Sequence, residues 1–113
     1  MTDFALPHLE LFGLFEIEEA GTILYARTEQ EESMEPVPDI RGQNFFELAS
    51  LENRVELQEK IDRFIISSNQ ADSFYVTNRL AAGEQRVKVL LGRIRHNSRD
   101  DDTTSVLVHI RRV

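Results

Sequence analysis

The spacing of hydrophobic and polar residues changes several times along the chain, and each change predicts a structural element. In "LFGLFEIEEAGTILYAR", residues 12–18 and 22–27 form two short runs around Gly21. Two such runs joined by a turn predict a β-hairpin. The next stretch, "TEQEESMEPVPDIRG", is acidic and contains Pro36 and Pro38, so we expect a short helical turn followed by a loop.

Residues 54–68 have the spacing of an amphipathic helix. Their apolar side chains recur every three or four residues, at Leu57, Ile61, Phe64 and Ile65. This spacing places them on one helical face. Asn53, with Glu56 three residues later, predicts an N-cap and a capping box at the start of the helix.

From residue 73 onward the alternation has a period of two, which predicts strands. The alternating stretches are residues 73–80, 85–94 and 104–113. The first link contains Gly83 and has hairpin length, whereas the second, "HNSRDDDT", is longer and polar. Consecutive strands with such links predict an antiparallel meander.

The order of the elements predicts an α+β domain with a five-stranded antiparallel sheet. The long helix has one apolar stripe, so we expect it to cover one face of the sheet. The other face carries residues that are out of phase with the core, namely Leu90, Ile94, Leu107 and His109. We expect residues 1–11, with Phe4 and Leu9, to fold back over this face, or a second subunit to cover it.

Length and composition limit the possible functions. The 113 residues suit one domain with its own core, and the absence of Cys excludes disulfides, thiolate metal sites and Cys nucleophiles. No apolar run approaches the roughly 20 residues that span a bilayer. Asp3 and Glu10 stand where a signal peptide would carry basic residues. We therefore expect a cytoplasmic protein that does not bind membranes.

The net charge of −7 is unevenly distributed. Residues 1–60 contain 14 acidic and 4 basic side chains, whereas residues 61–113 contain 6 acidic and 9 basic ones. The acidic half repels nucleic acid, and the later Arg residues lie on predicted strands without interleaved exposed aromatic residues. We therefore expect no nucleic-acid binding.

Several stretches, in this order, resemble a PAS domain, the small sensory module of bacterial and other signalling proteins. They are "LFGLFEIEEAGTILYA", "IRGQNFFEL", the long helix, and a meander ending in "SVLVHIRRV". Within the family, "GQNFFEL" and the closing "RRV" are most similar to the photoactive yellow protein branch. The resemblance implies that residues 12–113 form a PAS-like sensory domain, with residues 1–11 as an N-terminal cap or dimerisation segment.

The sequence departs from the family where its members carry chemistry. Photoactive yellow protein attaches its chromophore to a Cys after the Phe-Phe segment, and the flavin-binding light sensors also use a Cys, but this chain has none. Haem-binding members commonly take an axial His from the long helix, and residues 54–68 contain no His. A chromophore bonded to Cys is therefore excluded, haem and flavin are not expected, and the identity of any cofactor stays open.

The resemblance places Phe45 and Phe46 in a short helix that closes one end of a cup between sheet and helices, with one ring toward the core and the other toward the lid. A pocket in this cup would be lined by Ile23, Tyr25, Phe46, Leu48, Ile61, Phe64, Phe74, Val76, Asn78, Val87, Val89, Val106 and Val108. Tyr25 and Asn78 are the polar members that would orient a ligand. Alternatively, these side chains simply fill the interior.

Metal binding and catalysis are not expected. The three histidines share no ligand spacing: His8, His96 and His109. Residues 100–102 are acidic but lack the Gly and Glu of a calcium loop. The acids of the first hairpin have no His, Ser or Lys placed by the sequence as a partner: Glu16, Glu18 and Glu19.

The sequence thus predicts a non-enzymatic sensory domain that binds a small molecule or a partner noncovalently. It would relay the signal through homodimer contacts or through an effector protein or domain. The alternative is a ligand-free dimerisation or adaptor module with a filled core. A small cofactor-independent enzyme is a third possibility.

Overall fold

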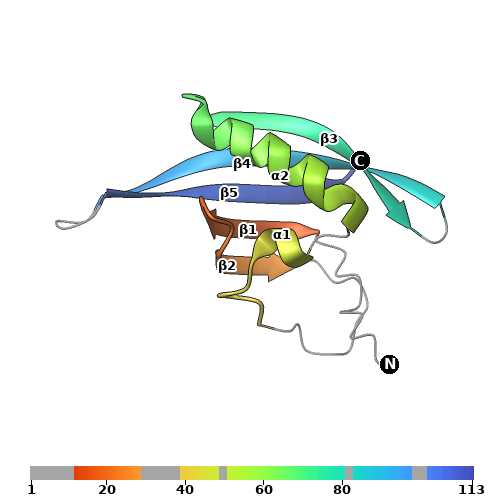
Figure 1. Ribbon diagram of the computed structural model, residues 1–113, viewed down its shortest axis with the longest axis horizontal. Coiled ribbons are helices and arrows are strands. Elements are labelled where there is room, and N and C mark those ends of the chain that lie inside the picture. Colours follow the sequence, from red (N-terminus) through yellow and green to blue (C-terminus); the bar gives the residue numbers. More distant parts are fainter. Residues whose placement is uncertain (1–11, 29–38, 49–50, 81–82, 98–101) are drawn as a thin grey trace.

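The computed structural model describes five segments of the chain: residues 12–28, 39–48, 51–80, 83–97 and 102–113. Two strands come first, two helices follow, and three strands complete the order (Figure 1). The elements are β1 (Gly13–Glu18), β2 (Ile23–Thr28), α1 (Phe45–Leu48), α2 (Leu51–Ile66), β3 (Ala71–Leu80), β4 (Gly83–Asn97) and β5 (Asp102–Arg112).

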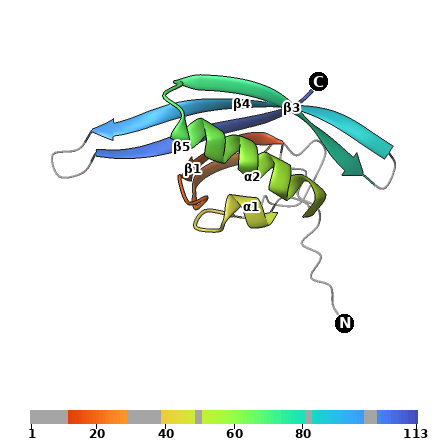
Figure 2. The ribbon, with the colours of Figure 1, turned by 45° about the horizontal axis from the view of Figure 1, so that its top comes forward.

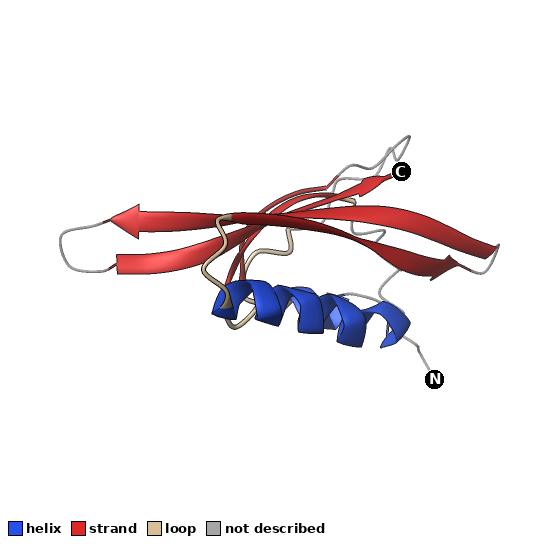
Figure 3. Cartoon of the chain, turned by 90° about the horizontal axis from the view of Figure 1, so that it is seen from above, coloured by secondary structure: helices blue, strands red, loops and turns tan. Residues whose placement is uncertain are grey.

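The strands form one antiparallel sheet in the order β2-β1-β5-β4-β3. The last strand, β5, lies between β1 and β4, so the first and last strands are neighbours inside the sheet. Both helices lie on the same face, as the view along the sheet in Figure 3 shows. In Figure 2, α2 runs across this face and packs along β3, while α1 lies beside α2. The α+β architecture predicted from the sequence is confirmed.

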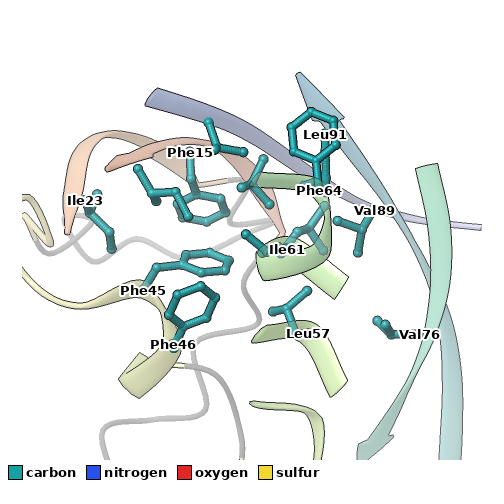
Figure 4. Packing of buried hydrophobic residues seen from close by; sticks show 14 of the residues in the cluster. Phe15, Ile23, Phe45, Phe46, Leu57, Ile61, Phe64, Val76, Val89 and Leu91 are labelled. Carbon is teal, nitrogen blue, oxygen red and sulfur yellow. The ribbon is translucent and has the colours of Figure 1, made fainter. Parts of the chain in front are cut away.

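The hydrophobic core fills the space between α2 and the covered sheet face. Leu57, Ile61 and Phe64 of α2 are 4%, 0% and 2% exposed, and Figure 4 shows them among the inward-facing side chains of the sheet. On the strands, Phe15 and Val89 are fully buried. Burying one such side chain contributes roughly 1.5–3 kcal/mol relative to leaving it in water. The apolar stripe of the helix and the period-two alternation of the strands therefore meet at one core.

The start of α2 differs from the sequence prediction. The helix begins at Leu51, so Asn53 lies inside its first turn, and the predicted capping box with Glu56 is wrong. An N-cap residue needs a non-helical backbone, which Asn53 does not have here. Leu51 and Glu52 are good helix formers and extend the helix beyond the expected cap.

Neither described helix is long and apolar enough to cross a lipid bilayer.

Candidate functional site

The "GQNFF" segment is held to the first hairpin by main-chain hydrogen bonds. The N–H of Gly42 donates to the carbonyl of Ile23 (2.7 Å), and the N–H of Ile23 donates to the carbonyl of Gln43 (2.9 Å). Two residues after Gln43, the N–H of Phe45 donates to the carbonyl of Gly21 (2.8 Å). The hairpin turn and the start of α1 are therefore joined by main-chain hydrogen bonds at the end of the cup.

Two residues explain why this unit fits together. Gly21 has a φ of +101°, and a Cβ there would lie 2.8 Å from Cδ2 of Phe46, so both the backbone and the space require glycine. Asn44 caps α1, because its Oδ1 accepts the N–H of Phe46 (2.9 Å). Its Nδ2 donates to the carbonyl of Ala20 (3.3 Å), which joins the cap to the hairpin turn.

Phe45 and Phe46 are both buried, at 0% and 4% exposed. The ring centroids of Phe45 and Phe15 are 5.3 Å apart, and those of Phe45 and Phe46 are 5.7 Å apart at 77°, an edge-to-face pair (Figure 4). Such pairs contribute about 0.5–1.5 kcal/mol beyond the area that they bury. The short helix thus closes one end of the cup with aromatic rings in tilted and edge-to-face contact.

Most of the proposed pocket residues face the interior. Those that are buried are Ile23, Phe46, Ile61, Phe64, Val76, Val87, Val89, Val106 and Val108. Leu48 and Phe74 are partly buried and pack against this cluster. The side chain of Asn78 lies outside the described residues. Whether any of these residues contacts a ligand stays a prediction.

Tyr25 does not face the interior, contrary to the sequence prediction. It is 47% exposed, because the β1–β2 register shifts between Glu16 and Ile17. Ile17 pairs with Ile23, but Glu16 pairs with Tyr25, so β2 has one additional residue at this point. A bulge of this kind moves the following side chains to the other sheet face. Tyr25 therefore cannot orient a ligand inside the cup.

The sheet face opposite the helices, called here the outer face, holds the four predicted interface residues that the structure describes. In register, Leu90 pairs with His109, Gly92 with Leu107, and Ile94 with Ser105. These four predicted residues are each partly buried: Leu90, Ile94, Leu107 and His109. No described helix covers them (Figure 3). Phe4 and Leu9, their predicted cover, lie outside the described residues.

One polar cluster on the outer face was missed at the sequence level. The hydroxyl of Ser105 donates to Oε2 of Glu16 (2.8 Å), and Nε2 of His96 lies 3.0 Å from the same oxygen and 3.1 Å from Ser105 Oγ. Ser105 is 1% exposed. Glu16 therefore has both a Ser and a His partner, contrary to the prediction. The alternation of each strand predicts that Glu16 and Ser105 both lie on the outer face. The sequence did not show that their strands are neighbours, so the contact between them could not be predicted.

Similarity to solved structures is found for this arrangement of sheet and helices. The PAS domain of Bordetella pertussis BvgS superposes with a TM-score of 0.59 at 8% identity, over 96% of this chain and 81% of that chain. The chain has a PAS-like fold. A PAS domain from Desulfitobacterium hafniense matches with a TM-score of 0.49 at 10% identity, over 94% of this chain and 96% of that one. The sequence matches no protein-family model and no curated protein.

The polar cluster on the PAS-like sheet does not have the geometry of a catalytic triad. In a triad, the carboxylate holds one imidazole nitrogen while the other nitrogen takes the proton of the serine. Here Glu16 and Ser105 both contact Nε2 of His96, and the serine proton is directed to the carboxylate. The arrangement satisfies a buried hydroxyl but does not activate it as a nucleophile.

Charged groups elsewhere in the PAS-like fold do not form a metal site among the described residues.

The Asp39–Arg41 pair before Gly42 is exposed, with Asp39 Oδ2 2.8 Å from Arg41 Nη2. The side-chain hydrogen bond from Arg41 lowers the pKa of the Asp39 carboxyl to about 2. This ion pair stabilises the loop that leads into α1. The stabilisation is fully present above the ordinary carboxyl pKa and is lost as the pH falls through about 2, where Asp39 becomes protonated.

Proposed function

We propose that the chain is a PAS-type sensory domain of a signalling system. It would bind a small molecule or a partner noncovalently in or at the cup, and relay this event through contacts on the outer face. The PAS-like fold carries the proposal, with one sheet face covered by helices and the other presenting partly buried apolar side chains. Large uncovered apolar surface commonly marks an interaction site.

The route of the signal would follow the sheet itself. Residues of β4 alternate between the two faces, so Val89 and Leu91 contact the core while Leu90 is on the outer face. A shift in the packing of the cup would therefore change the position of outer-face side chains on the same strand. Such a relay needs two packings that ligand or partner binds with different affinity.

The second candidate function is a ligand-free dimerisation or adaptor module. It is favoured by the contacts of Phe45, which lies against Phe15 and Phe46 at the end of the cup, and by the outward position of Tyr25. The absence of a triad geometry in the Glu16–His96–Ser105 cluster supports a non-enzymatic role for either candidate.

The outer face is tested by replacing Leu107 with Asp and measuring the mass of the oligomer in solution. We expect the wild-type chain to form a homodimer and Leu107→Asp to dissociate it, because the variant places a charge in an apolar contact. Val55→Asp on the exposed side of α2, where Val55 is 60% exposed, is the matched control. An unchanged oligomer mass for a folded Leu107→Asp protein would refute the outer face as the site of signal output.

A further inference from the structure

We propose that the edge of the sheet at β3 binds an extended acidic segment of a partner protein, which adds to the sheet as a further strand. The inference goes beyond the proposed function, because it concerns this edge rather than the outer face, and it holds for either candidate function. Three observations support it: main-chain groups directed away from the sheet, an acidic residue that closes one end of the edge, and cations on both sides of the remainder.

The strand β3 lies at the edge of the sheet (Figure 1). Among the described residues it pairs only with β4. The N–H of Arg93 donates to the carbonyl of Gln70 (2.9 Å), which makes these two residues a hydrogen-bonded pair just before the first pair of the ladder. Hydrogen-bonded and non-hydrogen-bonded pairs alternate in an antiparallel ladder, so Val76 also bonds to β4. The N–H and C=O groups of Tyr75 and Thr77 therefore point away from β4, toward the edge.

The first part of this edge is closed by a side chain of β3 itself. Oδ1 of Asp72 accepts the N–H of Ser73 (2.8 Å), and this N–H is also directed toward the edge. Asp72 is the single acidic residue of β3. It lies three residues before Tyr75, about 10 Å along the strand at about 3.3 Å per residue. The main-chain groups that a partner strand can use therefore begin near Tyr75.

Cations border this part of the edge on both faces of the sheet. On the outer face, the guanidinium carbon of Arg86 lies 4.3 Å and Nζ of Lys88 5.8 Å from the ring centroid of Tyr75. Both side chains thus extend from β4 toward the edge strand. On the face that the helices cover, Nζ of Lys60 on α2 lies 5.1 Å from the ring centroid of Phe74. Within the described part of the chain, none of these three cations has an acidic partner.

These features select an acidic segment as the occupant. A strand added to a sheet edge is bound by main-chain hydrogen bonds, which any sequence can make, so the neighbouring side chains determine specificity. Successive side chains of the added strand point to opposite faces. Acidic residues at every second position would lie beside Arg86 and Lys88, and the apolar residues between them would pack against Phe74, which is partly buried.

The same charges disfavour a second copy of the chain at this edge. Two copies paired through Tyr75 and Thr77 would bring their Arg86 and Lys88 side chains toward one another, and juxtaposed like charges are unfavourable. An acidic partner instead gains opposite-charge contacts on the outer face and a further one at Lys60. The attraction is local, because residues 61–113 contain 9 basic and 6 acidic side chains although the whole chain is acidic.

Binding of a designed peptide tests the proposal. The probe is a fluorescein-labelled peptide of about nine residues in which glutamate and valine alternate, and its counterpart has lysine in place of glutamate. By fluorescence anisotropy, we expect the glutamate peptide to bind about tenfold more tightly than the lysine peptide. Arg86→Glu should raise the dissociation constant of the glutamate peptide about tenfold. Arg95→Glu is the matched control, because Arg95 is exposed on the same strand about 30 Å from Arg86, and it should change this constant less than about twofold.

Amide hydrogen exchange measured by NMR distinguishes strand addition from attraction between charges alone. The N–H groups of Tyr75 and Thr77 would gain acceptors in the added strand, so their exchange should slow about tenfold at saturating peptide. The N–H groups of Phe74 and Val76 already bond to β4, so their exchange should change less than about twofold. Binding of the glutamate peptide without slower exchange at Tyr75 and Thr77 would overturn the proposed strand addition.

The remaining contrary results each overturn the proposal in a different way. No binding at about 1 mM glutamate peptide would show that the edge does not accept such a strand, and equal affinity for the lysine peptide would remove the role of the cations. Slower exchange that depends on protein concentration alone would assign the edge to a second copy. Leu107→Asp should bind the glutamate peptide with the affinity of the wild type, so failure of this proposal is distinguishable from failure of the outer-face contact.

Discussion

Arg93 is predicted to be the strongest single link between α2 and the sheet. It lies on β4 opposite Val106, and its guanidinium reaches the C-terminal end of α2. Nη2 donates to the carbonyls of Phe64 (2.7 Å) and Ser67 (2.8 Å), with longer bonds to Ile65, and Nε donates to the carbonyl of Asn69 (3.2 Å). The last carbonyls of a helix have no partner within the helix, so this side chain satisfies several of them together.

The cost of removing this side chain follows from these contacts. Two short charge-assisted hydrogen bonds contribute about 1–1.5 kcal/mol each at a partly buried site. The guanidinium carbon also lies 5.1 Å from the ring centroid of Phe64, which adds about 0.5 kcal/mol. We therefore expect Arg93→Ala to lower the free energy of unfolding by about 3 kcal/mol. Arg93→Lys keeps the charge but not the planar fork, so it should lose about half as much.

The assay is urea unfolding followed by far-ultraviolet circular dichroism, with the slope m checked for two-state behaviour. Arg95→Ala is the matched control, because Arg95 is an exposed arginine on the same strand without a hydrogen-bond partner among the described residues. It should change the free energy of unfolding by less than about 0.5 kcal/mol. An Arg93→Ala protein within the same limit would refute the proposed role of this link.

Four further substitutions test the end of the cup and the polar cluster by the same unfolding assay. Gly21→Ala should lower the free energy of unfolding by about 2–3 kcal/mol. Gly42→Ala should lower it by about 1 kcal/mol, because Gly42 also has a positive φ but no atom lies within 4 Å of the added Cβ. Equal losses would contradict the contact with Phe46. Phe45→Ala should cost about 3–5 kcal/mol, and a loss below 2 kcal/mol would show that the site is not tightly packed. Ser105→Ala should cost about 1 kcal/mol by removing a hydroxyl donor, and no loss would show that the hydrogen bond to Glu16 adds no stability.

The sequence pattern was sufficient for the main elements of the fold. The alternation in β3, β4 and β5 and the stripe of Leu57, Ile61 and Phe64 in α2 are local signals that burial imposes, so they can be read without a structure. The PAS resemblance supported a single five-stranded sheet, whereas the strand order β2-β1-β5-β4-β3 came only from the structure. The structure confirms this fold.

The sequence predictions failed at two kinds of position. In one, a shift of one residue in strand register decides which face a side chain occupies, and in the other, the partner of a side chain is distant in the sequence. The bulge opposite Glu16 moves Tyr25 to the outer face, and no local pattern marks an additional residue in a short strand. The partners of Arg93 are main-chain carbonyl groups 24–29 residues away in the sequence. Every residue has such a carbonyl, so the residue types do not indicate which of them will accept a hydrogen bond. Ser105 meets Glu16 only because β5 lies beside β1.

Native mass spectrometry of the gently purified protein, recorded before and after denaturation, tests the central claim most directly. The sensory proposal predicts a mass above 13.1 kDa per chain that returns to this value on denaturation, which would indicate a noncovalently bound small molecule or partner. The same spectrum gives the number of subunits. A homodimer without any bound species, unchanged after incubation with cell extract, would contradict the sensory proposal and support the ligand-free interaction module.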